Sequence, residues 1–270
     1  MTQLRIIQPR WGWGLEKEPQ SGSFSRRLIV TTYGLPCVVQ AVVFEGNFTM
    51  YKIAIFFRKT ATPNLFRDLI IKSLASDFDS YVACSAFFQE TPNTKQPFST
   101  SSELIGALSQ RKPTKTAHID AYGIYGGKWT SQFRQSCQLL DNYAKKINPN
   151  ISFNFFKFKN KSHAKIFIAK ENNINSLAII GSSNLSAGAF ANRLQKNSWN
   201  HESDVIFWNT KSNTANTLMG ILLDKHSDQI KDSTFVTNYD DSFFSNDISV
   251  NDKLTNLEII LKDNSNTFTY

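Results

Sequence analysis

Apolar and polar residues alternate along the chain from Met50 onward in a pattern that predicts short strands separated by amphipathic helices. The clearest helical stripe is Leu65, Leu69 and Leu74, which follows the helix-start signal Pro63-Asn64. The predicted strands cover 51–57, 81–88, 118–125, 151–158, 163–169, 176–180 and 204–208. The further predicted helices cover 101–108, 130–146 and 214–230. This alternation is typical of a layered α/β domain, with a mixed central sheet covered by helices on both faces.

The composition changes near residue 50 and suggests three segments. Residues 1–49 hold four of the nine arginines but only one of the 21 lysines, whereas the later chain is rich in Lys, Asn, Phe and Ile. We interpret 1–49 as an N-terminal extension, 50–232 as the main domain, and 233–270 as a polar C-terminal tail. A second interpretation is that Met50 is the native start, so that 1–49 is a fusion or a mis-called start.

The net charge of +8, with a pI near 9.3, favours an anionic partner such as nucleic acid or a phospholipid surface. The longest apolar runs are too short to span a bilayer, and residues 1–25 lack the apolar run of a secretory signal. The three cysteines are scattered, without a CxxC pair or a histidine at zinc spacing. These features predict a cytoplasmic protein that needs no metal ion and no other cofactor.

His163 and Lys165 stand at the start of one predicted strand. Residues i and i+2 of a strand point to the same face, so these two side chains are expected to project together. A neutral imidazole can attack phosphorus and form a covalent phosphohistidine. Lys165 would supply positive charge for the non-bridging oxygens of the phosphate.

The segment Gly181-Ser182-Ser183-Asn184 follows the next predicted strand, sixteen residues after Lys165. Glycine permits close approach of the backbone, and the two hydroxyls and the carboxamide add hydrogen-bond donors for the same phosphate. Glu202 precedes the strand 204–208, and its carboxylate could bind a histidine and fix its tautomer. The chemistry of these residues predicts a phosphodiester site that works without a metal ion.

The pattern His163-x-Lys165 with Gly181-Ser182-x-Asn184 resembles the HKD signature of the phospholipase D superfamily. The resemblance implies a phospholipase D-like α-β-α sandwich in which Lys165 and Asn184 bind the phosphate and Ser182 assists. It also implies that Glu202 takes the place of the family's acid after the motif.

In that family two copies of the motif build one active site. One histidine attacks, and the other protonates the leaving oxygen and then activates water. This chain has one copy, so the resemblance implies a homodimer that completes the site, with His163 in both roles.

Lys170 stands where the family often has an acidic residue. A subgroup of metal-independent endonucleases, which includes restriction enzymes, also lacks that acid and keeps the later glutamate. Residues 68–89 resemble the opening helix and strand of those nucleases, and the resemblance covers about 50–232. It implies a DNA endonuclease of the restriction or defence type.

Other activities stay open at this point. The 38 residues after Asp232 are too few for a separate recognition domain. Nonspecific cleavage of DNA or RNA is therefore an alternative, and so is a fragment that lacks its recognition domain. A phospholipid phosphodiesterase or transferase would use the same chemistry.

Lys157, Lys159 and Lys161 lead into the motif, and strand alternation would set them on one face beside the proposed site. There they could follow a phosphate backbone, together with Phe156 and Phe158. An ordinary solvated strand face explains them equally well.

The other three histidines carry weaker signals. His118 begins an apolar strand and is expected to be structural. His201 is expected to face away from Glu202, and His226 to lie on a solvated helix face.

Overall fold

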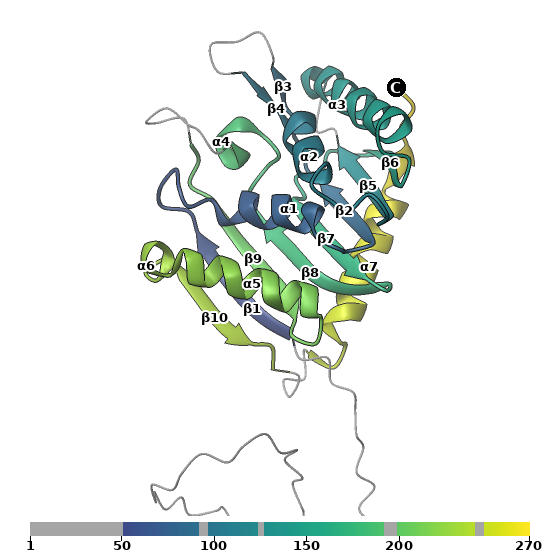
Figure 1. Ribbon diagram of the computed structural model, residues 1–270. Helices are drawn as coiled ribbons and strands as arrows, with labels where there is room; N and C mark the ends of the chain where they lie inside the picture. The colour runs from purple at the N-terminus through teal and green to yellow at the C-terminus, as the bar shows by residue number, and fades with distance from the viewer. Residues whose placement is uncertain (1–50, 92–96, 124–126, 192–198, 241–245) are drawn as a thin grey trace, which may run out of the picture. The chain divides into compact units, whose positions relative to one another are not determined.

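The structure, a computed structural model, describes residues 51–91, 97–123, 127–191, 199–240 and 246–270. The predicted extension 1–49 lies outside the described residues. At the centre is a nine-stranded sheet with the order β10-β1-β9-β8-β7-β2-β5-β6-β11 (Figure 1). The pairs β2–β5 and β5–β6 are parallel, and the other neighbours are antiparallel. The predicted layered α/β fold with a mixed central sheet is therefore confirmed.

The strands of this sheet are β1 Tyr51–Phe57, β2 Ser80–Cys84, β5 Ala117–Gly123, β6 Ile151–Phe158, β7 Ile166–Glu171, β8 Ile174–Gly181, β9 Ser203–Asn209, β10 Thr234–Asn238 and β11 Ser265–Thr267. A small second sheet pairs β3 Glu90–Thr91 with β4 Phe98–Ser99. The helices are α1 Leu65–Ala75, α2 Thr100–Leu108, α3 Gly127–Lys146, α4 Ala187–Phe190, α5 Asn213–Lys225, α6 Ser227–Ile230 and α7 Val250–Asp263.

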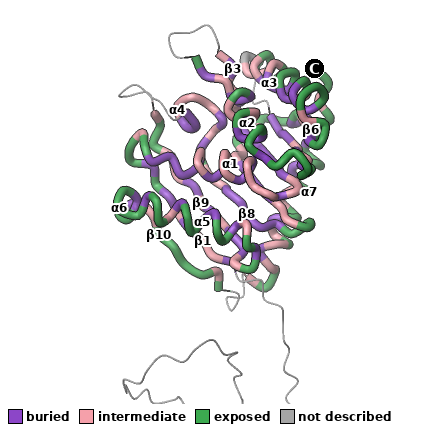
Figure 2. The backbone as a smooth tube through the Cα atoms, in the orientation of Figure 1, coloured by how far each residue is buried: buried purple, intermediate pink, exposed green. Residues whose placement is uncertain are grey.

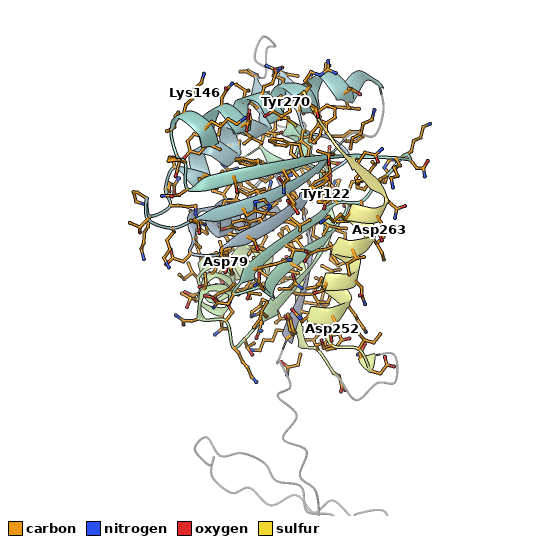
Figure 3. The ribbon with its side chains drawn as sticks, turned by 90° about the vertical axis from the view of Figure 1, so that its right-hand side faces the viewer. Asp79, Tyr122, Lys146, Asp252, Asp263 and Tyr270 are labelled. Atoms are coloured by element: carbon orange, nitrogen blue, oxygen red, sulfur yellow. The ribbon has the colours of Figure 1, made fainter. Side chains whose placement is uncertain are left out.

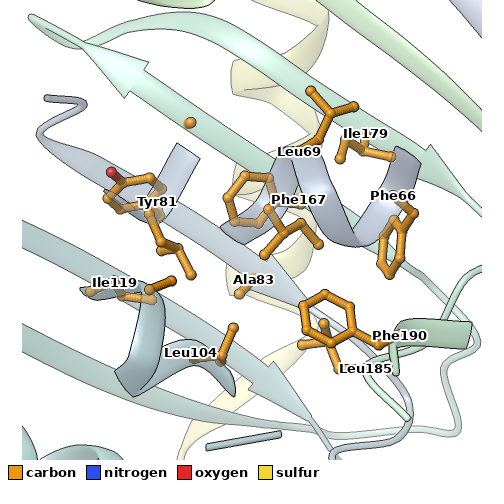
Figure 4. Close-up of a cluster of buried hydrophobic side chains, with 14 of the residues drawn as sticks. Phe66, Leu69, Tyr81, Ala83, Leu104, Ile119, Phe167, Ile179, Leu185 and Phe190 are labelled. Atoms are coloured by element: carbon orange, nitrogen blue, oxygen red, sulfur yellow. The ribbon is translucent and has the colours of Figure 1, made fainter. Parts of the chain in front are cut away.

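One face of the sheet is covered by α1, α2, α3 and α5 (Figure 1). Each helix turns an apolar stripe inward; the stripe of α1 includes the predicted Leu65, Leu69 and Leu74, all buried. Between helices and sheet, side chains such as Phe66, Phe167 and Ile179 form the larger core cluster (Figure 4). Burial of this apolar surface is the main contribution to the stability of the domain.

The opposite face carries α7 (Figure 3). Val250, Leu254 and Leu261 of α7 pack against a second cluster that includes Ile166 and Ile168 of β7. The central strands are therefore buried on both faces, whereas β10 at the sheet edge is mostly exposed (Figure 2).

The segment 233–270, predicted to be a tail, is instead built into the domain. β10 pairs with β1, and β11 pairs with β6, so this segment supplies both edge strands of the sheet. Lys170 of β7 forms an ion pair with Glu258 and so attaches α7 to the sheet. The prediction failed because β10 and β11 are short and largely polar, and edge strands need no continuous apolar pattern.

Two histidines lie outside the predicted site. His226 was predicted to lie on a solvated helix face but is buried, where the helix predicted over 214–230 breaks into α5 and α6, and its Nε2 lies 3.2 Å from Asp68 Oδ2 of α1. His118, predicted to be structural, is half-buried, and its ring lies 2.9 Å from Ser152 Oγ and 3.0 Å from Asp120 Oδ1.

A tight hairpin joins β7 to β8. Its two turn residues, Asn172 and Asn173, have φ values of 54° and 64°, which is the left-handed geometry of a type I′ turn. Asparagine tolerates this region better than other residues with a Cβ. The turn is shorter than the segment left between the predicted strands 163–169 and 176–180. Together with a register shift between Ala169 and Lys170, it sets how the two strands that lead to the predicted site pair.

Candidate active site

The β7–β8 hairpin brings the two halves of the predicted motif to one edge of the sheet. Ile166 pairs with Ile180, so the next residues along, Lys165 and Gly181, lie opposite each other. The Gly181 amide donates to the Lys165 carbonyl at 3.1 Å. The sixteen-residue spacing seen in the sequence is thus the length of one hairpin.

His163 and Lys165 lie just before β7, not within it, because the strand begins at Ile166. His163 is exposed and Lys165 is half-buried. Ala164 and Ile166 both pack in the cluster on the α7 side, as the predicted alternation requires. The Lys165 ammonium donates to the His163 carbonyl at 2.6 Å.

The charge of Lys165 is set by two opposing effects. Burial lowers the pKa of its ammonium, and the negative charge of Glu202 raises it. A lysine that is partly desolvated interacts more strongly with an arriving anion than a fully hydrated lysine would.

Gly181 has no room for a side chain. A Cβ at this position would collide with the Asp204 carboxylate and lie 2.6 Å from the Ser203 carbonyl of β9. The glycine is therefore needed for the close approach of β8 to β9, where Gly181 pairs with Asp204.

Ser182 and Glu202 form a connected pair at the same edge. The Ser182 hydroxyl donates to Glu202 Oε2 at 2.5 Å and accepts from the Ser203 amide at 2.9 Å. The Asn200 carboxamide donates to the other Glu202 oxygen at 3.1 Å. Both carboxylate oxygens of Glu202 are thus held in place, and each keeps lone pairs for a further donor.

Ser183 was predicted to contribute a donor to the substrate, but it is buried and bound elsewhere. Its hydroxyl donates to Asp204 Oδ2 at 2.6 Å, and its amide donates to Asp204 Oδ1 at 3.3 Å. Burial raises the pKa of Asp204 to about 6, the two Ser183 hydrogen bonds oppose that rise, and the charge of Glu202 adds to it. Ser183 therefore contributes to the shape of the turn.

Asn184 is contacted by Ser85, which directly follows β2, two strand positions from β8. The buried Ser85 hydroxyl lies 3.4 Å from Asn184 Oδ1 and accepts from the Leu185 amide at 3.1 Å. Just beyond, Phe88 forms a parallel bridge with Leu185. Contact between Ser85 and the carbonyl oxygen of the Asn184 carboxamide leaves its NH2 group to point elsewhere.

Arg58 supports the site from β1. It is buried, and its guanidinium donates to the carbonyls of Gly188 and Ala189 at 2.9 Å each. Its backbone amide donates to the Glu202 carbonyl at 2.9 Å, which ties β1 to the site. Burial lowers the pKa of this guanidinium, and the charges of Glu202 and Asp204 raise it.

Ser85, Asn200, Asp204 and Arg58 were not found by sequence reasoning. Each is a common polar residue with no motif of its own. Arg58 and Ser85 come from segments that only the sheet brings to the site, whereas Asn200 and Asp204 flank Glu202. A weak signal existed for Asp204, because it stands two residues after Glu202 at the start of a predicted strand.

The three predicted backbone-binding lysines do not share a strand face. β6 ends at Phe158, so Lys159 and Lys161 lie beyond the strand, although all three are exposed. The Lys159 ammonium donates to the Asp263 carbonyl at the end of α7, 2.6 Å away. β6 lies three strand positions from β7, which separates Lys157 from Lys165 by roughly 14 Å across the sheet.

Two kinds of feature are absent from the described residues, a metal-binding cluster and a membrane-spanning helix. No three His, Cys, Asp or Glu side chains in the described ranges gather closely enough to hold a metal ion. No helix in that part of the chain has the length and apolar character to cross a bilayer.

Comparison with known proteins gave no family model and no curated protein that matches this chain. Among solved structures, it is similar to Nuc of Salmonella typhimurium, a phospholipase D family member, with 14% identity and a TM-score of 0.37. That alignment covers 70% of this chain and 98% of Nuc.

Two longer proteins are also similar. The phosphatidylserine synthase of Haemophilus influenzae Rd KW20 matches with 14% identity and a TM-score of 0.40, over 79% of this chain and 46% of the synthase. Yeast tyrosyl-DNA phosphodiesterase matches with 16% identity and a TM-score of 0.34, over 59% of this chain and 47% of the phosphodiesterase. This chain thus spans about half the length of each of these two proteins.

Proposed function

We propose that this chain is a phosphodiesterase that cleaves DNA without a metal ion, through a phosphohistidine formed on His163. The observation that carries the proposal is the pairing of Lys165 with Gly181 at the end of the hairpin. Because of this pairing, the segment with His163 and the turn with Ser182 and Asn184 begin at neighbouring points of one sheet edge.

In this proposal the substrate phosphate is held by Lys165, Ser182 and the NH2 group of Asn184. The ammonium and the uncharged donors would stabilise the negative charge on the non-bridging oxygens, which grows as the nucleophile approaches. The single hydroxyl proton of Ser182, which Glu202 accepts in the described structure, would turn from Glu202 to the phosphate when substrate binds. The charge of Glu202 favours the protonated form of Lys165.

The reaction would run in two steps. First, an imidazole nitrogen of His163 bonds to phosphorus while the bond from phosphorus to the leaving oxygen breaks, and a nearby acid protonates that oxygen. Second, that group takes a proton from water, the water oxygen bonds to phosphorus, and the nitrogen–phosphorus bond breaks. We propose that the acid is the partner subunit's His163, brought to the site by a two-fold dimer.

The substrate is proposed to be DNA, in a restriction-type or defence reaction. The charge of +8 supports a polyanionic substrate, and the exposed Lys157, in the last residues of β6, and Lys161, beyond that strand, add positive charge near its end. The departure at Lys170 fits the endonuclease subgroup. Lys170 lies five residues from Lys165, roughly 16 Å along β7. An acidic side chain at that position would therefore be too far away to contact a phosphate bound by Lys165.

The test is to incubate the purified chain with supercoiled plasmid in excess EDTA, beside His163→Ala at equal concentration. Lys225→Ala, on the exposed side of α5, is a matched surface control that should cleave like the wild type. Cleavage by the wild type and the control, with loss in His163→Ala, is the expected result. Quenching with denaturant at alkaline pH, where the nitrogen–phosphorus bond survives, should also trap a chain covalently joined to DNA that is absent in His163→Ala.

Other outcomes would separate the alternatives. Discrete fragments support site-specific cleavage, whereas a smear supports a nonspecific nuclease, and a parallel RNA digest separates DNA from RNA. If plasmid is untouched and phosphatidylcholine vesicles are hydrolysed, the DNA proposal is wrong and the phospholipid alternative holds. Equal cleavage by wild type and His163→Ala would remove His163 from the mechanism.

A further inference from the structure

A buried carboxylate lies directly beneath the turn that the proposed mechanism uses to bind phosphate. Asp204 is 1% exposed, at the start of β9, and lies opposite Gly181 of β8. The absence of a side chain at Gly181 leaves the space that this carboxylate occupies. Gly181 and Asp204 therefore fit each other as a pair.

Asp204 binds the turn through both of its oxygens. Oδ1 accepts from the Ser183 amide and Oδ2 from the Ser183 hydroxyl, at 3.3 and 2.6 Å. Ser183 lies between Ser182 and Asn184, so fixing Ser183 fixes the spacing of those two residues. An asparagine in this place would offer one acceptor oxygen to two donors and would turn its NH2 group toward one of them.

A buried carboxylate is costly for a fold that needs only a tight turn. Among the described residues, Arg58 and Glu202 interact electrostatically with it, and Glu202 has the same sign. Hydrogen bonds to a charged acceptor are shorter and stronger than bonds between neutral groups, and they hold their donors more rigidly. The desolvation cost of this carboxylate is offset by a functional gain if the reaction requires a rigid turn.

We propose that Asp204 is a positioning residue, which acts through Ser183 to set the distance between Ser182 and Asn184 at the substrate phosphate. This inference rests on the proposed phosphodiesterase function. It assigns Asp204 and Ser183 to one unit that touches neither substrate nor leaving group. Misplacement of binding groups by about 1 Å is enough to slow an enzymatic reaction roughly 100-fold.

The test uses Asp204→Asn, Ser183→Ala and the double variant. The matched control is Glu171→Gln, at the far end of the same hairpin, where Glu171 accepts from the Ser212 and Thr214 hydroxyls at 2.7 and 2.9 Å. The first measurement is amide hydrogen exchange over 181–185. The second is kcat and KM with bis(p-nitrophenyl) phosphate.

We expect faster exchange over 181–185 in Asp204→Asn and in Ser183→Ala, but not in the control. We expect kcat to fall about 10- to 100-fold while KM changes much less, because alignment is lost and the phosphate ligands remain. The double variant should be no slower than the slower single variant, because both substitutions break the same link. Unchanged exchange, or fully additive losses in kcat, would overturn the inference.

The exchange measurement tests the link between Asp204 and the turn independently of the proposed function. A wild-type chain that hydrolyses no phosphodiester would refute the phosphodiesterase, while the exchange data would still report whether Asp204 holds the turn. If Asp204→Asn does not fold, Ser183→Ala removes the hydroxyl bond of the same link while the amide bond to the carboxylate remains.

Discussion

At the scale of single residues, Gly181 and Gly220 differ in whether they leave space for a side chain. Gly181→Ala would press a methyl group against the Asp204 carboxylate and the Ser203 carbonyl. We expect a loss of about 1–3 kcal/mol in the free energy of unfolding, and loss of activity as the turn shifts. Gly220→Ala in α5 meets no atom within 4 Å and should gain about 0.5–1 kcal/mol, because alanine is the better helix former. Urea unfolding of both variants checks the contrast, and equal stabilities would contradict it.

Asp204 also predicts a dependence of stability on pH. Its pKa is raised in the folded state from 3.8 to about 6, so the folded chain binds this proton more tightly than the unfolded chain. The resulting stabilisation is complete below about pH 4 and is lost as the pH rises through 6. A rise of about two pKa units corresponds to about 3 kcal/mol. The wild type should lose this much more stability between pH 4 and 7 than Asp204→Asn does, as measured by urea unfolding at several pH values. Parallel profiles for the two proteins would be the contrary result.

At the scale of elements, the β7–β8 turn decides where the two halves of the motif meet. Asn172 and Asn173 both have positive φ, which costs most residues with a Cβ about 1–2 kcal/mol. Asn173→Ala should therefore lower the free energy of unfolding by about 1 kcal/mol, whereas Asn173→Gly should preserve or raise it. Both variants should keep their kcat while folded, because the turn lies at the opposite end of the hairpin from Lys165. Thermal unfolding with a plasmid cleavage assay tests this, and equal destabilisation by both substitutions would speak against it.

The elements also show what the sequence could and could not predict. Buried strands such as β8 have continuous apolar runs, and α1 has an apolar stripe, so both were predicted close to their bounds. β10 and β11 were missed because their positions depend on pairing with β1 and β6, not on their own residues. Within the site, the motif residues were recognisable from their spacing. Ser85, Arg58 and Asp204 were not, since a hydrogen bond between strands distant in sequence leaves no periodic pattern.

At the scale of the whole molecule, the proposed residues come from five neighbouring strands, or from the segments just outside them, and all lie at one edge of the sheet. Five adjacent strands take part, in the order β1, β9, β8, β7 and β2. The residues just outside their ends on the side of the site are, in the same order, Arg58, Glu202, Ser182, Lys165 and Ser85. The two carboxylates Glu202 and Asp204 lie among the cations Lys165 and Arg58, so local charge is partly balanced before substrate binds. The proposed dimer would place a second subunit over these strand ends, where its own His163 would supply the proton.

If two chains share one active site, a chain that lacks the nucleophile should abolish cleavage by the wild-type chain with which it pairs. Wild type mixed with a nine-fold excess of His163→Ala, and left to exchange subunits, should retain about a tenth of its cleavage rate per wild-type chain, because few wild-type chains would pair with each other. Chains that each hold a complete site would keep their full rate in the same mixture. Lys225→Ala in place of His163→Ala serves as the control for dilution, since it carries an intact motif. Light scattering at the assay concentration should show a dimer wherever the cleavage rate falls in this way.

A monomer with full activity would mean that the acid comes from the same chain. The exposed His201 beside Glu202 would then be the first residue to substitute.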